Sequence, residues 1–184
     1  MTGTVYSVPP IPPDAEHTTW VGAGAISIGV EYRLLDDAEL AAHYQGEQMT
    51  EIQRATGGNA VQDNGVSLHV ADSSDGHEYL RFDLFQQEPH YHYIELSGDK
   101  QTIVDYDAVA LGPMLPWALA QIRTRLAEML SFAGGEALVP KLDAARIDAS
   151  LVEVEKLAHQ AEDALAASGG SSPSPVSPSS PGRT

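Results

Sequence analysis

Apolar residues alternate with polar residues in three segments of the first half of the chain. The pattern is clearest in AISIGVEYRLL, residues 25–35, where every second residue is apolar, and it predicts a strand with one buried face. These apolar residues are Ile26, Ile28, Val30, Tyr32 and Leu34. GVSLHVAD, residues 65–72, predicts a second strand, and EYLRFDLF (78–85) with HYHYIEL (90–96) predicts a β-hairpin.

A helical spacing of apolar residues appears between these strands and dominates the second half. Asp36 and Asp37 can cap a helix over residues 38–55, which Gly57 and Gly58 would end. A second helix begins near Pro116 and closes at Gly134 and Gly135. A third is predicted over residues 144–167, with apolar residues at steps of three and four. Its apolar residues are Leu151, Val154, Ala158, Ala161 and Leu165.

The order of these elements predicts an α+β fold. We expect an antiparallel sheet of about four to five strands, packed by a long amphipathic helix and followed by a further C-terminal helix. Residues 1–20 are rich in proline and predict an extended arm. Residues 21–135 then form the core domain and residues 136–167 a C-terminal helical segment. Residues 168–184, rich in serine and proline, predict a disordered tail.

Composition excludes several classes of function. The 26 acidic residues exceed the 10 Lys and Arg residues, for a formal net charge of -16, so we expect no binding to nucleic acid. The chain has no cysteine, which excludes disulfides, thiolate nucleophiles and cysteine-ligated metals. No apolar run approaches the length of a membrane span and no signal peptide precedes the first strand, so we predict a cytoplasmic protein.

The two histidines of EPHYHYIEL, residues 88–96, are the main candidate for a site of chemistry. We expect Gln86 to lie opposite His90, because this register keeps one face of the hairpin apolar. Both His90 and His92 then point to the apolar side, that of Phe82. Two imidazoles one residue apart on a strand share a face, as paired metal ligands often do.

A metal site would need a third ligand. His69, His77, Asp83 and Glu95 are the candidates in the sequence. If the apolar residues beside His69 are buried, alternation places His69 on the face opposite to them and away from the pair. The alternative to a metal site is a hairpin in which both histidines are structural. We prefer that alternative and expect no cofactor, with a divalent transition metal as the second hypothesis.

Two groups of residues are candidates for contacts with a protein partner. The aromatic residues of the hairpin, Tyr91, Tyr93 and Phe85, could form an exposed face, although a covering helix is the preferred interpretation. The apolar seam of the last predicted helix is the second group. Its candidate residues are Leu151, Val154 and Leu165.

Two segments together carry a resemblance to a known family. FDLFQQEPHYHYI, residues 82–94, followed by LPWALAQIRTRLAEML, residues 115–130, is similar to a family of small bacterial proteins of unknown function. The similarity covers about half of the chain. It implies an α+β fold and supplies no catalytic residues.

These observations leave two functional hypotheses. The chain contains no GxGxxG, GxSxG or HExxH motif, so we predict a non-catalytic accessory or scaffold protein that self-associates and binds a protein partner in a larger complex. The alternative is a small metal-dependent or ligand-binding enzyme that uses His90 and His92.

Overall fold

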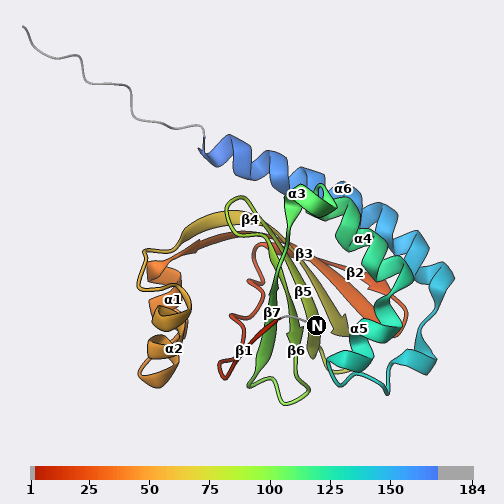
Figure 1. Ribbon diagram of the computed structural model, residues 1–184. Helices are drawn as coiled ribbons and strands as arrows, with labels where there is room; N and C mark the ends of the chain where they lie inside the picture. The colour runs from red at the N-terminus through yellow and green to blue at the C-terminus, as the bar shows by residue number, and fades with distance from the viewer. Residues whose placement is uncertain (1–2, 170–184) are drawn as a thin grey trace, which may run out of the picture.

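A seven-stranded antiparallel sheet forms the centre of the structure, a computed structural model that describes residues 3–169 (Figure 1). The strand order is β1-β7-β6-β5-β4-β3-β2, so β2 to β7 follow one another across the sheet in chain order, and β1 lies at the far edge beside β7. The strands are β1 (Thr4–Tyr6), β2 (Thr18–Ala23), β3 (Ile26–Asp36), β4 (Gln62–Asp72), β5 (Glu78–Phe85), β6 (His90–Ile94) and β7 (Gln101–Asp105).

The predicted α+β class is confirmed, but the prediction of about four to five strands is wrong, because the sheet has seven. β1 lies within the proline-rich segment, and β2 overlaps its end. Both are edge strands, and β2 is largely exposed on both of its faces. An edge strand of this kind needs no apolar alternation, so the pattern that reveals β3 and β4 is missing from it.

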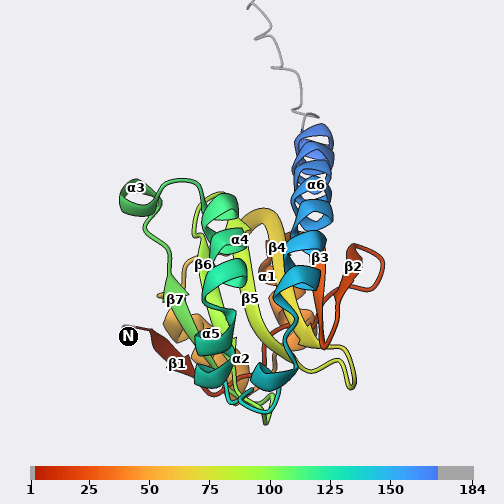
Figure 2. The same ribbon diagram turned by 90° about the vertical axis from the view of Figure 1, so that its right-hand side faces the viewer.

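Two groups of helices cover the two faces of the sheet. α4, α5 and α6 pack on one face, with α6 against β2 to β4 and α4 and α5 against β5 (Figure 2). α1 and α2 lie on the other side, after β3 (Figure 1). The helices are α1 (Asp37–His43), α2 (Glu47–Ala55), α3 (Ala108–Leu111), α4 (Met114–Thr124), α5 (Leu126–Phe132), the short 3-10 helix η1 (Val139–Lys141) and α6 (Ala144–Gly169).

The helix predicted over residues 38–55 is two helices. Asp36 caps α1 as expected, accepting hydrogen bonds from the amides of Ala38 and Glu39. The chain is extended at Tyr44 and reverses at Gly46, where φ is +57°. Tyr44 turns inward there and its hydroxyl donates to the Pro9 carbonyl at 2.7 Å, so a long-range contact overrides the local helical pattern.

The helix predicted to begin near Pro116 is also divided in two. It begins at Met114 and breaks at Arg125, which separates α4 from α5. The predicted stop is confirmed, because Gly134 has a φ of +88° and the Gly135 amide donates to the Leu130 carbonyl at 2.7 Å.

The main core lies between the sheet and the layer of α4, α5 and α6. The alternating apolar residues of β3, β4 and β5 point into it, as their spacing predicts, except Leu34 near the end of β3, which is exposed. They meet the apolar stripes of α4, α5 and α6. The deeply buried members of this core include Ile26, Ile28, Leu68, Val70, Leu80, Phe82, Ile122, Leu130, Leu151 and Val154.

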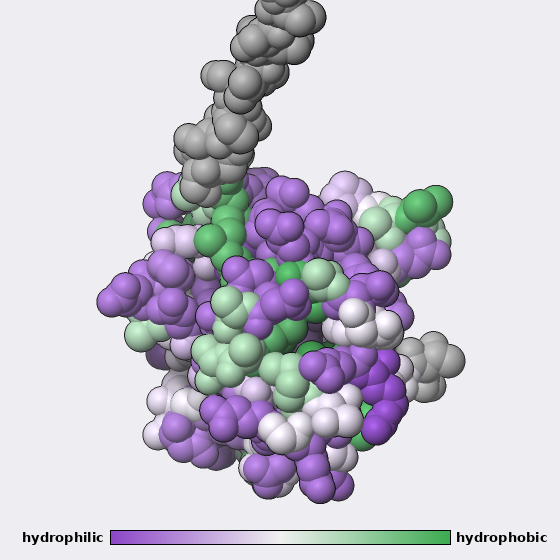
Figure 3. All heavy atoms as spheres, turned by 90° about the vertical axis from the view of Figure 1, so that its left-hand side faces the viewer, coloured by the Kyte–Doolittle hydropathy of each residue, from purple (hydrophilic) through white to green (hydrophobic). Residues whose placement is uncertain are grey.

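A smaller apolar cluster lies on the opposite face of the sheet. It consists of Val8 and Ile11 from the segment after β1, together with Leu40 and Tyr44. Figure 3 views the molecule from this side and shows hydrophobic side chains around a hollow within a largely hydrophilic surface. The proline-rich segment therefore packs across the sheet as part of a second, minor core.

The sequence also predicts a disordered C-terminal tail and no membrane span. The predicted disordered tail falls outside the described residues, except for residues 168 and 169 at the end of α6. Within residues 3–169, no helix combines the length and the hydrophobicity that crossing a membrane requires.

Candidate metal centre

The hairpin of β5 and β6 has a different register from the predicted one. Asp83, not Gln86, lies opposite His90, and Arg81 lies opposite His92. An offset of three residues is odd, so it moves every side chain of β6 to the other face of the sheet. The histidines therefore point away from the main core, and the prediction that they share a face with Phe82 is wrong.

Burial of aromatic rings accounts for this register. Tyr91 pairs with Phe82 across the strands and packs against Trp117 of α4, with ring centroids 5.2 Å apart. Tyr93 packs edge to face on Phe132 of α5 at 4.6 Å. These contacts bury a large apolar area. In the predicted register, Tyr91 and Tyr93 would instead lie on the polar face of the sheet.

The turn between β5 and β6 is held from a distant strand. The Asp63 carboxylate, at the start of β4, accepts hydrogen bonds from the amides of Gln87 and Glu88 at 3.2 and 2.9 Å. The Tyr106 amide donates to the Pro89 carbonyl at 2.9 Å. This anchoring fixes the carbonyl of Glu88, which contacts His90.

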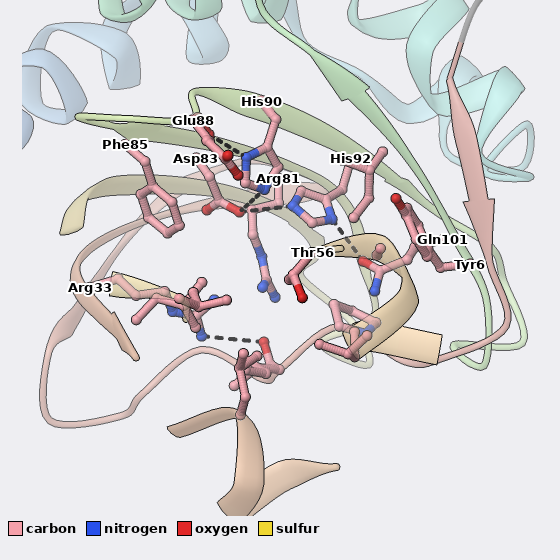
Figure 4. Close-up of a pocket in the computed structure, with 18 of the residues that line it drawn as sticks. Tyr6, Arg33, Thr56, Arg81, Asp83, Phe85, Glu88, His90, His92 and Gln101 are labelled. Carbon is pink, nitrogen blue, oxygen red and sulfur yellow. Dashed lines mark hydrogen bonds and ion pairs between the residues drawn. The ribbon is translucent and has the colours of Figure 1, made fainter. Parts of the chain in front are cut away.

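Three potential ligand atoms converge on the polar face of the hairpin (Figure 4). His92 Nε2 lies 2.8 Å from Asp83 Oδ2, and His90 Nε2 lies 3.3 Å from the same oxygen. The ligand atoms of the three residues all lie within 4.8 Å of one another. Asp83 and His92 are buried and His90 is half-buried.

The other ring nitrogen of each histidine faces a fixed acceptor. His90 Nδ1 lies 2.6 Å from the Glu88 carbonyl, which can only accept, so Nδ1 carries a proton. His92 Nδ1 lies 2.7 Å from Gln101 Oε1. The Gln101 amide nitrogen donates to the Val8 carbonyl at 3.2 Å, which fixes the orientation of this amide. Both Nε2 atoms are therefore the atoms free to accept a proton or to bind a metal.

The carboxylate of Asp83 is ionised in this environment. Burial raises its pKa, but the contacts of its carboxylate with the imidazoles of His90 and His92 outweigh burial and hold the pKa well below its usual range. Ser67 Oγ also donates to Asp83 Oδ1. The centre thus carries a fixed negative charge on the oxygen that faces both imidazoles.

The two histidines differ in their affinity for a proton. Burial lowers the pKa of His92 below 6.5. Burial also acts on His90, but the hydrogen bond and the charge of Asp83 raise the pKa of His90 above 6.5. If both imidazoles were neutral, two Nε2 lone pairs would face one carboxylate oxygen. A positive charge at this point, either a proton or a metal ion, removes the repulsion.

The donor set and its dimensions fit a divalent transition metal. Two imidazole nitrogens and one carboxylate oxygen are ligands that zinc and ferrous iron accept in proteins. Metal bonds of about 2.1 Å imply ligand atoms about 3.0–3.4 Å apart. The observed separations of 2.8 and 3.3 Å from Asp83 Oδ2 are close to this range, and because the three ligand atoms lie within 4.8 Å of one another, a bound metal would draw the two imidazoles together. Three protein ligands leave coordination positions for water or another molecule.

Of the four candidate third ligands, only Asp83 joins the cluster. His69 lies on the same face of the sheet but contacts Glu31 at 2.8 Å and Glu78 at 2.6 Å through its two ring nitrogens. His77 packs edge to face on Tyr79. Glu95 is exposed after the end of β6. The expectation that His69 lies on the opposite face from the histidine pair is wrong, because the observed register places the side chains of His90 and His92 on the other face of the sheet from the predicted one.

A row of paired charges crosses the sheet beside the centre. Glu31 contacts Arg33 at 3.3 Å, and His69 bridges Glu31 to Glu78. Glu78 accepts two hydrogen bonds from Arg81, at 2.9 and 2.6 Å. Sequence reasoning missed this row, because polar residues that alternate with apolar ones are also typical of a strand face in contact with water.

A cavity of about 180 Å³ opens beside the three residues (Figure 4). Its polar lining comes mainly from the sheet, and its apolar lining from α1, α2, the segments that flank them and the segment after β1, with Phe85 and Ile103 of the sheet. The polar lining residues include Arg33, Arg81, Asp83, His90, His92 and Gln101. The apolar lining residues include Ile11, Leu35, Leu40, Tyr44, Ile52 and Val61.

The comparison with known proteins identifies a family but no activity. A domain of unknown function, DUF7700, matches residues 20–158. The chain belongs to the DUF7700 family. This agrees with the predicted resemblance to a family of unknown function. No curated protein and no solved structure matches the chain.

The DUF7700 match contains the whole candidate centre, since Asp83, His90, His92 and Gln101 all lie inside residues 20–158. It does not contain Val8 and Ile11, which cover the polar face from the segment after β1. The candidate metal ligands and most of the cavity therefore belong to the DUF7700 domain, and part of the cover lies outside the matched residues.

Most of the residues predicted to contact a partner are buried within the fold of this chain. In the hairpin, Tyr93 is buried and Tyr91 partly buried under the helices, and Phe85 is buried on the opposite face beside His90. In α6, Leu151, Val154 and Leu165 belong to the main core. Binding of a partner through these residues stays a prediction.

Proposed function

We propose that this chain binds a divalent transition metal through Asp83, His90 and His92 and uses it on a small molecule held in the adjacent cavity. The observation that carries the proposal is the shared orientation of the two imidazoles. Each Nδ1 is committed to a fixed acceptor, so both Nε2 atoms are left to meet the Asp83 carboxylate at one point.

The surroundings support a reactive centre more than a purely structural one. A structural metal site is closed by four protein ligands, whereas three protein ligands leave positions for a substrate. Asp83, His90 and His92 all line the cavity. A metal bound there would act as a Lewis acid or lower the pKa of a bound water.

The chain's own residues would orient and hold the ligands. Gln101 and the Glu88 carbonyl keep each imidazole in the required tautomer. Ser67 holds the second oxygen of Asp83, so one carboxylate oxygen is directed at the histidines. The alternative prediction of a scaffold protein stays untested, and we favour metal binding because it accounts for this arrangement.

Isothermal titration of the purified, chelator-treated chain with Zn²⁺ and Co²⁺ tests the proposal. We expect one site per chain and a visible absorption spectrum of the Co²⁺ form that reports nitrogen and oxygen ligands. His90→Ala should weaken metal binding by at least about 100-fold, because it removes one of the three ligands. His90 is the least buried of the three. Gln101→Ala should weaken it by about 10–100-fold, because His92 loses the acceptor that orients it.

His159→Ala is the matched control, since His159 is an exposed histidine on α6, far along the chain from the centre. Its affinity for metal should equal that of the unmodified chain. Circular dichroism of each variant would establish that it is folded before titration. Failure of the unmodified chain to bind either metal, or equal binding by His90→Ala, would contradict the proposal.

A further inference from the structure

The cavity beside the candidate centre has two chemically different walls. The sheet side carries two arginines, two histidines and Asp83 beside the apolar Phe85 and Ile103, and the opposite side carries apolar residues of the minor core. A ligand that fills this space must therefore have a polar end and an apolar end. The cavity volume of about 180 Å³ restricts it to a small molecule.

Arg81 is the residue best placed to hold the polar end. Its Nε and Nη2 atoms donate to Glu78, while no hydrogen bond joins its Nη1 atom to any part of residues 3–169. In Figure 4 the Arg81 side chain extends from the strand toward the middle of the cavity. A buried guanidinium with a donor directed into a cavity is suited to an anionic group.

Two arginines, Arg33 and Arg81, line this wall together with the carboxylates Asp83 and Glu88, although the chain as a whole is strongly acidic. Arg33 and Arg81 line the cavity, whereas the carboxylates that pair with them, Glu31 and Glu78, do not. Burial raises the pKa of Glu78, but the charges of Arg81 and His69 lower it by more and keep Glu78 ionised, so this counter-charge stays behind the wall. Bound metal would add further positive charge on the same side.

We propose that the cavity binds a small amphipathic carboxylate, with its carboxylate at Arg81 and at the open side of the metal, and its apolar body against Leu40, Tyr44 and Ile52. This inference rests on the proposed function, because it names the class of molecule that the metal centre would act on. A carboxylate is favoured over a phosphate ester because Arg81 presents one uncommitted nitrogen and the opposite wall offers apolar contact, not further donors.

Isothermal titration with hexanoate, n-hexanol and inorganic phosphate tests the inference, on both the Zn²⁺-loaded and the metal-free chain. We expect hexanoate to bind with at least about tenfold higher affinity than either of the other two probes, since only it matches both walls. Metal loading should strengthen hexanoate binding and leave hexanol unchanged. Zn²⁺ titration without any probe is run separately and tests the metal centre alone.

Two alanines on the covering helices provide a matched pair of variants. Ala55 of α2 lines the cavity, and Ala41 of α1 is exposed and does not line it. Ala55→Phe should weaken hexanoate binding at least about tenfold by filling the apolar end, whereas Ala41→Phe should not change it. Both variants should bind Zn²⁺ like the unmodified chain, because neither alanine is one of the three candidate metal ligands. Arg81→Gln should also weaken hexanoate binding, but this substitution breaks the ion pair with Glu78. If the Arg81→Gln variant does not fold, the comparison of Ala55→Phe with Ala41→Phe tests the inference.

The outcomes separate the two proposals. If Zn²⁺ binds but hexanoate binds no better than hexanol, the ligand inference is overturned and the metal centre stands. If phosphate binds more tightly than hexanoate, the carboxylate assignment is overturned. If Zn²⁺ does not bind but hexanoate binds and is lost in Ala55→Phe, the cavity assignment is supported and the metal centre is contradicted.

Discussion

At the scale of single residues, one buried histidine links most of the charges on the polar face. His69 is fully buried and its two ring nitrogens contact the carboxylates of Glu31 and Glu78. Burial lowers its pKa and the nearby Arg81 opposes its charge, but Glu78 and Glu31 raise the pKa more, so it lies above 6.5. Protonated His69 therefore separates two carboxylates that would otherwise repel one another.

This raised pKa makes stability depend on pH in a definite direction. The folded chain holds the His69 proton more tightly than the unfolded chain, so the stabilisation is fully present below pH 6.5 and is lost as pH rises through the folded pKa. We expect the free energy of unfolding to fall with pH in that window. His69→Gln should reduce this dependence and lower the free energy of unfolding by about 3–5 kcal/mol, because two buried carboxylates lose their partner.

Urea denaturation between pH 5.5 and 9 in the presence of a chelator would measure both effects. The chelator keeps metal binding out of the comparison. His43→Ala serves as the control, because this histidine is partly exposed on α1 and makes a single contact with Glu39. Identical pH dependence in the unmodified chain and in His69→Gln would contradict the assignment.

At the scale of secondary-structure elements, close approach of β4 and β5 fixes the strands that present Asp83. Gly65 pairs with Phe85 across these strands, and a Cβ atom at Gly65 would meet the Leu84 carbonyl oxygen and lie 2.8 Å from Phe85 Cα. These neighbours are backbone atoms, so they cannot move aside as a flexible side chain does. Gly65→Ala should therefore lower the free energy of unfolding by about 1–3 kcal/mol.

Gly22 offers a matched comparison in the same sheet. It lies on the edge strand β2, and a Cβ atom there meets nothing within 4 Å. Gly22→Ala should change the free energy of unfolding by no more than about 0.5 kcal/mol. Thermal or urea denaturation of the two variants would compare them, and an equal effect at both positions would show that the close approach of β4 and β5 carries no strain.

The sequence predicted the elements better than it predicted how they meet. Alternation found β3, β4 and β5 because each strand buries one face against helices, a local pattern. It could not find the register of β5 and β6, because that depends on Asp63, on Trp117 and on Phe132, all distant in sequence. The partners of the histidine pair could not be predicted for the same reason.

The candidate ligands were predictable as residues but not as a site. His90 and His92 share a face by spacing alone, whatever the register. Asp83 becomes their partner only because it lies opposite His90 in the observed pairing. Arg33 and Arg81 could be read as solvent-facing residues until α1, α2 and the segment after β1 were seen to cover them.

At the scale of the whole molecule, the sheet separates two cores of unequal size. The main core packs α4, α5 and α6 against one face, and the minor core holds α1 and α2 through few buried residues. Leu40 is the single buried residue of α1, and α2 has none. The cavity lies on the side of the minor core, so access to it depends on the less firmly packed part of the molecule.

Hydrogen exchange followed by mass spectrometry should resolve these two parts. Amides of α1 and α2 should exchange through local opening at a lower free energy than amides of β3 to β5, which exchange only when the main core opens. Zn²⁺ together with hexanoate should slow exchange in α1 and α2 more than in α6, because a bound ligand stabilises the closed form of the cavity that these two helices cover. Protection that rises equally in α6 would instead indicate a single cooperative unit, in which the minor core opens only with the whole fold.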